Sequence, residues 1–148
     1  MAWRRSLCTS AVLIGAILGT TGTASADPVT TLDPATTLGG GELPCFGQVK
    51  AFYDPARDFF GDQVMWIRAE LTSLAVGSSS CGLNATVSWR NLDAGTSGVT
   101  RPIPLGDDGS HNALWVPINT SRTPGRIEVT TDTDQPHLPG HGSFVIPG

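Results

Sequence analysis

The sequence has little positive charge and only one lysine, Lys50, among its 148 residues. Nine basic side chains face 13 acidic ones, and two of the nine, Arg4 and Arg5, lie at the extreme N-terminus. Residues 27–148 therefore carry seven basic and 13 acidic side chains, a net charge of −6. A chain of this composition lacks the basic surface with which proteins bind nucleic acid or anionic lipid. We therefore expect no nucleic-acid partner.

The chain also lacks a hydrophobic run long enough to span a membrane. Its longest apolar stretch, residues 7–19, has about 13 residues, whereas a spanning helix needs about 20. An arginine pair precedes this stretch, and the small residues 24–26 follow it. Such an arrangement is typical of a secretory signal peptide. We predict that residues 1–26 are a signal peptide cleaved after Ala26, and that the mature chain is secreted without membrane insertion.

Cysteine is scarce as well. Because Cys8 lies inside the predicted signal peptide, only Cys45 and Cys81 remain in the mature chain. Two thiols in an exported protein have a single intramolecular pairing. We predict a disulfide between them, and the alternative is two reduced, buried cysteines.

No stretch after residue 44 shows a helical hydrophobic period longer than one turn. Instead, apolar and polar residues alternate in short runs separated by turn residues. The runs cover residues 45–53, 64–75, 81–90, 99–105, 111–118, 125–132 and 142–147. This pattern predicts an all-β fold over residues 44–148, an antiparallel β-sandwich of about seven strands.

Residues 27–43 lack this alternation. They contain two Asp-Pro pairs and three consecutive glycines. We predict a flexible N-terminal leader there.

Within the first connecting loop, Asp54 followed by Pro55 favours one helical turn.

The run over residues 81–90 places Trp89 in the same phase as Leu83 and Val87, so Trp89 is predicted to lie in the core. Cys81 has that same phase, which directs its sulfur inward.

Residues 44–148 resemble immunoglobulin-like and fibronectin-like sandwiches. The resemblance lies in the number of strands, in the inward disulfide and in the core tryptophan near it. In immunoglobulin domains, however, the tryptophan lies between the two cysteines, and here it follows both.

A possible metal site lies near the C-terminus. His137 and His141 are four residues apart, with Asp132 and Asp134 just upstream. Two histidines and one carboxylate can hold a transition metal if a turn brings them together. The alternative is a polar loop before the last strand.

The remaining candidate site is aromatic. Phe52 and Trp66 fall on the polar phases of their runs, which predicts that they lie outside the core. The other members of the predicted patch are Phe59, Phe60, Arg68 and Glu70. An exposed apolar patch with charged edges marks an interaction site on many soluble proteins. The alternative is a central strand whose two faces are both covered.

These features predict an exported, disulfide-stabilised β-sandwich that acts as a non-enzymatic binding or interaction module outside the cytoplasmic membrane. Its ligand is expected to be a protein or an envelope carbohydrate, and no cofactor is expected. The alternative function is a metal-assisted hydrolase that uses His137 and His141 with Asp132 or Asp134.

Overall fold

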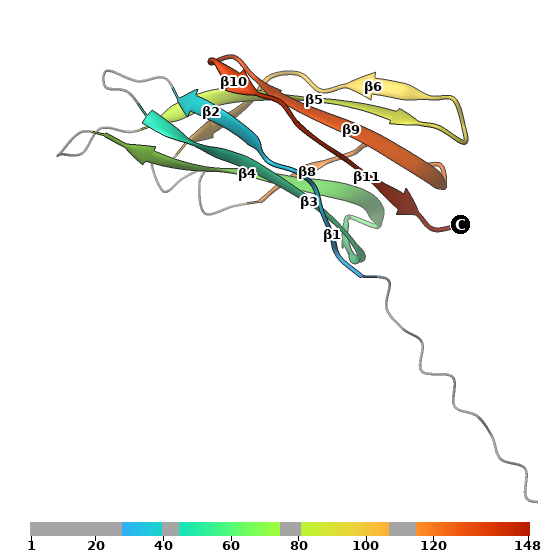
Figure 1. The fold of residues 1–148 in the computed structure, drawn as a ribbon. Helices are drawn as coiled ribbons and strands as arrows, with labels where there is room; N and C mark the ends of the chain where they lie inside the picture. Colours follow the sequence, from blue (N-terminus) through green and yellow to red (C-terminus); the bar gives the residue numbers. More distant parts are fainter. Residues whose placement is uncertain (1–27, 40–44, 75–80, 107–114) are drawn as a thin grey trace, which may run out of the picture.

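The computed structural model describes residues 28–39, 45–74, 81–106 and 115–148, so the predicted signal peptide lies outside the described residues. Within these ranges the chain forms 11 strands and no helix. The strands make two antiparallel sheets packed face to face (Figure 1). The predicted all-β sandwich is therefore confirmed, whereas the immunoglobulin-like resemblance stays a prediction.

The first sheet, which we call sheet A, contains in spatial order β10 (His137–Leu138), β2 (Ala35–Gly39), β3 (Cys45–Phe59), β4 (Asp62–Ser73) and β8 (Val116–Ile118), with β1 (Thr30–Thr31) beside β3. Sheet B contains β11 (Gly140–Ile146), β9 (Gly125–Thr133), β5 (Gly82–Asn91) and β6 (Ser97–Val99), with β7 (Ile103–Gly106) beside β5. The predicted runs correspond to β3, β4, β5, the pair β6 and β7, β8, β9 and β11. The four residues 111–114 of the fifth run lie outside the described residues.

The prediction of a flexible leader over residues 27–43 is wrong for residues 30–39. These residues form β1 and β2, which both pair with β3. The inward side chains of β2 are Ala35 and Thr37, both buried. Thr37 hydrogen-bonds Thr133 of sheet B across 3.0 Å. Because small and polar side chains take the inward positions, the segment shows no hydrophobic alternation.

The core forms where the apolar phases of the two sheets meet. Tyr53 of β3 stacks on Phe144 of β11, with 4.2 Å between ring centroids. Trp89 keeps the predicted inward phase and packs against the core while remaining partly exposed. Its indole lies over Gly98 of β6, where a Cβ atom would come within 2.7 Å of the ring. The glycine therefore makes room for the tryptophan.

The predicted disulfide is confirmed. Cys45 in β3 is bonded to Cys81, which directly precedes β5. Both residues are buried, and the bond joins sheet A to sheet B. It thereby fixes one end of the sandwich covalently.

The disulfide closes a loop of 36 residues. Replacing both cysteines with alanine should lower the free energy of unfolding by about 4 kcal/mol, because the unfolded chain gains the freedom that the bond removes. Urea denaturation of the mature protein measures this difference. A double variant as stable as the wild type would contradict the structural role of the bond.

Candidate binding surface

The outer faces of the two sheets differ in chemistry. Along β5 and β9, the outward positions of sheet B carry polar or charged residues, among them Thr86, Ser88, Arg90, Glu128 and Thr130. The outer face of sheet A carries Leu38, Phe46, Phe52, Trp66 and Trp115 together with Lys50, Arg68 and Glu70. An antiparallel sheet that faces water on one side normally presents polar side chains there. Sheet B exposes single apolar side chains, Val99 and Val145, on its flanking strands, whereas sheet A gathers several aromatic rings on its outer face.

The register of the β3–β4 hairpin brings most of the predicted patch together. Phe52 lies opposite Trp66, and Lys50 lies opposite Arg68. Glu70 follows two residues along β4, on the same face. Phe52, Trp66, Arg68 and Glu70 thus lie together on sheet A, although Trp66 itself is only 7% exposed. For Trp66, the alternative of a covered position is correct.

Arg57 and Phe59 cover the Trp66 ring. The guanidinium carbon of Arg57 lies 4.3 Å from the centroid of that ring, and the Phe59 ring is nearly perpendicular to it, with 6.1 Å between centroids. Arg57 also lies 5.8 Å from the centroid of Phe52. Arg57 thus packs against both rings while its own side chain stays exposed.

A bulge in β3 carries Arg57 over the sheet. The register against β4 shifts after Tyr53, and the Asp54 side chain accepts a hydrogen bond of 3.0 Å from the amide of Ala56. This Asx-type turn replaces the helical turn predicted from Asp54 and Pro55, which is wrong. The extra residues displace Arg57 from the regular ladder and allow it to lie across the face.

A second cation lies over a second indole. Trp115, just before β8, meets Phe52 edge-on with 4.5 Å between centroids. The guanidinium carbon of Arg68 lies 4.9 Å from the Trp115 ring centroid. Cation–π contacts of this kind contribute about 0.5–2 kcal/mol each, depending on exposure. Each of the two tryptophan rings on this face therefore packs against a guanidinium group.

Glu70 forms ion pairs with two cations. Hydrogen bonds from Lys50 and then from Arg68 lower the pKa of the Glu70 carboxyl group. All three side chains remain about one-third or more exposed. Because one carboxylate neutralises only one of the two cations, the cluster keeps one net positive charge.

The tip of the β3–β4 hairpin exposes Phe60. This residue is 93% exposed and has a backbone φ of 54°, and the next residue, Gly61, has a φ of 82°. Two central residues with positive φ are typical of a type I′ hairpin turn, in which Asn-Gly is preferred. A phenylalanine in the left-handed region costs on the order of 1 kcal/mol. Phe60 touches Phe59, whose centroid is 4.5 Å away, so the tip is an exposed aromatic pair.

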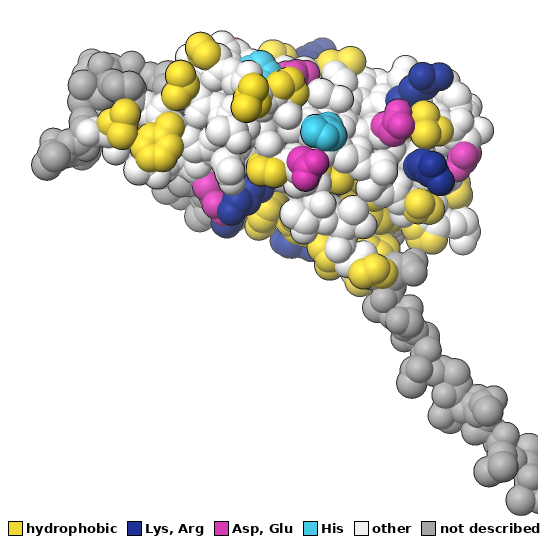
Figure 2. All heavy atoms as spheres, in the orientation of Figure 1, with side chains coloured by type: hydrophobic (Ala, Val, Ile, Leu, Met, Phe, Trp, Pro, Cys, Tyr) yellow, Lys and Arg dark blue, Asp and Glu magenta, His cyan; other side chains and the backbone are white. Residues whose placement is uncertain are grey.

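A groove of about 840 Å³ crosses the other end of the same face. It lies over β10, β2, β3 and β4, and hydrophobic side chains gather around the ends of β2 and β10 in Figure 2. Three exposed apolar side chains line it, namely Leu38, Phe46 and Leu138. Arg68 and Glu70 line it as well. The groove therefore connects an apolar area to the charged cluster.

The residues of the alternative metal site do not converge. His137 lies on β10 in sheet A and contacts Asp132 across 3.3 Å, whereas His141 lies on β11 in sheet B and contacts Asp33 across 3.4 Å. Asp134 instead accepts two hydrogen bonds from Asn84. Among residues 28–39, 45–74, 81–106 and 115–148, no three metal-ligating side chains cluster.

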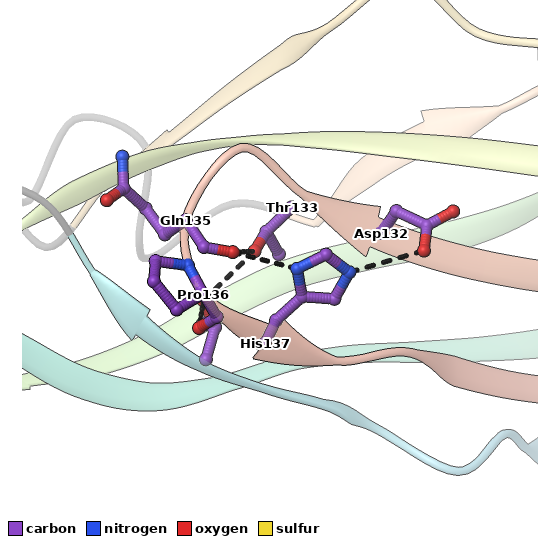
Figure 3. A network of polar contacts seen from close by, with 6 residues as sticks. Asp132, Thr133, Gln135, Pro136 and His137 are labelled. Carbon is purple, nitrogen blue, oxygen red and sulfur yellow. Dashed lines mark hydrogen bonds and ion pairs between the residues drawn. The ribbon is translucent and has the colours of Figure 1, made fainter.

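His137 joins the sheets at the point where the chain crosses between them. Its Nδ1 contacts the carbonyl of Gln135 across 2.8 Å, and its Nε2 faces the carboxylate of Asp132 (Figure 3). The hydrogen bond to Gln135 and, to a smaller extent, the Asp132 carboxylate raise the pKa of His137. Nearby, Thr133 also donates to the Gln135 carbonyl. The histidine therefore stabilises the sandwich edge.

No family model matches the chain, and neither a curated protein nor a solved structure matches it.

In the part of the chain that the structure describes, no helix has the length and apolar character needed to cross a membrane.

The sequence prediction missed several members of this surface. Trp115 lies outside the core because Val116 and Ile118 point inward, and the alternation of residues 115–118 carries that signal. Leu38 falls in the segment predicted to be a flexible leader. Arg57 reaches the face through a bulge, which hydrophobic periodicity does not reveal.

Because Trp66 is buried between Arg57 and Phe59, we expect Trp66→Ala to lower the free energy of unfolding by about 3 kcal/mol. Phe60→Ala is the matched control and should change it by less than about 0.5 kcal/mol, since that side chain is exposed. Chemical denaturation distinguishes the two. Similar small losses for both variants would show that Trp66 is not packed as described.

The raised pKa of His137 predicts a pH-dependent stability. Its contribution should be fully present below the unfolded pKa of about 6.5 and lost as the pH rises through the higher folded pKa. Between about pH 6 and pH 8, the stability advantage of the wild type over His137→Gln should therefore shrink. His141→Gln, at an exposed position, serves as the control. An advantage that grows with pH would contradict the described contacts.

Proposed function

We propose that this chain is an exported, disulfide-stabilised β-sandwich that acts as a non-enzymatic binding module outside the cytoplasmic membrane. Its binding surface is the outer face of sheet A together with the Phe59–Phe60 tip. The partner is a protein or an envelope carbohydrate. The observation that carries this proposal is Phe60, a large apolar side chain held almost fully in solvent by an unfavourable backbone conformation. Asparagine or glycine would adopt this turn conformation at lower cost, so a contact outside the chain explains the phenylalanine best.

Two buried donors on the same face support the proposal. The indole nitrogen Nε1 of Trp66 and the guanidinium Nε of Arg68 are buried without an acceptor among the described residues. A buried polar group left without a partner costs about 1–3 kcal/mol. The outer face of sheet A therefore combines several features that reduce stability, as expected where function and stability compete.

The alternative of a metal-assisted hydrolase has less support. It requires His137, His141 and one aspartate to converge on one ion. The two histidines lie on different sheets and contact different aspartates. Their geometry favours a role in holding strands together.

Site-specific photo-crosslinking tests the proposed surface in cells that produce the protein. A benzophenone amino acid at Phe60 should yield covalent adducts with protein or glycan. The same residue at Val145, which is 61% exposed on sheet B, is the matched control and should yield none. Equal labelling at both positions, or none at Phe60, would contradict the proposed surface.

Phe60→Asn should separate stability from binding. Asparagine tolerates positive φ, so we expect the free energy of unfolding to rise by about 1 kcal/mol. Crosslinking through a benzophenone at Phe59 should nevertheless fall, because the exposed ring is gone. Urea denaturation and adduct yield are measured on the same variant. A variant that loses stability and retains full adduct yield would show that Phe60 serves the fold.

A further inference from the structure

The groove on sheet A, which rests on the proposed binding function, has two chemically different ends. At the apolar end, Leu38 is 57% exposed, Phe46 45% and Leu138 72%. These residues come from the neighbouring strands β2, β3 and β10, and Leu38 lies directly opposite Phe46. Three large apolar side chains on adjacent strands form a contiguous surface that a complementary apolar ligand can bury.

The other end of the groove is cationic. Arg68 and Glu70 line this end, and Lys50 lies opposite Arg68 in the register, in an adjoining hollow that the same two residues also line. Lys50 is 41% exposed, and Glu70 is shared between the two cations. Lys50, Arg68 and Glu70 together keep one net positive charge on the outer face. Residues 27–148 as a whole have a net charge of −6. The positive charge is thus local, which favours a ligand with a carboxylate or another anion at this end.

The arrangement of the aromatic rings favours a peptide over a carbohydrate. Sugars bind proteins by stacking on open aromatic faces, but the guanidinium groups of Arg57 and Arg68 lie over Trp66 and Trp115. Among its described lining residues, the groove contains one phenylalanine, Phe46, the imidazole ring of His137 and three leucines, Leu38, Leu71 and Leu138. Protruding aliphatic and aromatic side chains next to arginine are typical of protein interfaces.

We propose that the groove binds a segment of a protein partner that carries an acidic side chain next to large apolar side chains. The apolar side chains pack on Leu38, Phe46 and Leu138. The carboxylate lies against Lys50 and Arg68, where it balances the charge that Glu70 leaves uncompensated. Water-exposed cations at the rim set orientation and specificity more than affinity.

A random dodecapeptide display library, selected on the mature protein, tests this specificity. We expect the enriched peptides to carry Asp or Glu beside Leu, Ile, Phe or Met. Leu38→Ser should weaken binding of a selected peptide about tenfold, as expected for the loss of an apolar anchor. Val145→Ser, a similarly exposed position on sheet B, should leave the affinity unchanged. Circular dichroism verifies that each variant is folded.

Charge reversal gives a second, independent readout. Lys50→Glu should weaken binding of the acidic peptide about tenfold, and exchanging the peptide's acidic residue for lysine should restore it. Arg126→Glu, exposed on sheet B, is the control and should have no such effect. A glycan array that includes uronic-acid sugars is probed in parallel.

The failure of this inference is distinguishable from the failure of the proposed function. Peptides without acidic residues, affinities unchanged by Leu38→Ser and Lys50→Glu, or no enriched peptide would overturn the peptide inference. Binding only to uronic-acid glycans would overturn it too, while the proposed binding surface remains. Absence of specific crosslinking at Phe60 would instead overturn the proposed function.

Discussion

The pairing register between β3 and β4 is the constraint on which the rest of the structure depends. It places Tyr53 and Ile67 in the core and Phe52 opposite Trp66 on the outer face. A shift of one residue would exchange the two faces. The strands also approach closely at Gly47, where a Cβ atom would lie 2.0 Å from a backbone carbonyl oxygen of β4. Glycine at this position is therefore needed for the pairing, which in turn aligns Lys50, Arg68 and Glu70.

Stability and the proposed binding function are divided between the two ends and faces of this hairpin. At the start of β3, the disulfide and the apolar core hold the sheets together. At the tip, Phe60 adopts a conformation that asparagine or glycine would adopt at lower cost. Between the disulfide and the tip, the guanidinium groups of Arg57 and Arg68 pack on Trp66 and Trp115. A covalent bond across the sheets offsets the unfavourable terms on the outer face.

The sequence predicted the parts of the fold in which large apolar side chains alternate. The phases of β3, β4 and β5 were correct, and so were the pairing of the two cysteines and the position of Trp89. β2 was missed because its inward residues are Ala35 and Thr37, which carry no hydrophobic signal. The covering of Trp66 was missed because Arg57 reaches it through a bulge. A hydrophobic periodicity does not reveal contacts that arise from bulges and other irregular backbone. About half of the residues of the candidate surface were therefore identified only from the structure.

Hydroxyl-radical footprinting tests the central claim most directly, because it labels exposed side chains one by one. Labelling is compared between the purified protein and the protein in the cells that produce it. We expect protection of Leu38, Phe46, Phe60 and Leu138 on the sheet A side, and no protection of Val99 and Val145, which are 68% and 61% exposed on sheet B. Protection of Val99 and Val145 with unchanged labelling of Phe60 would contradict the assignment of the outer face of sheet A as the binding surface.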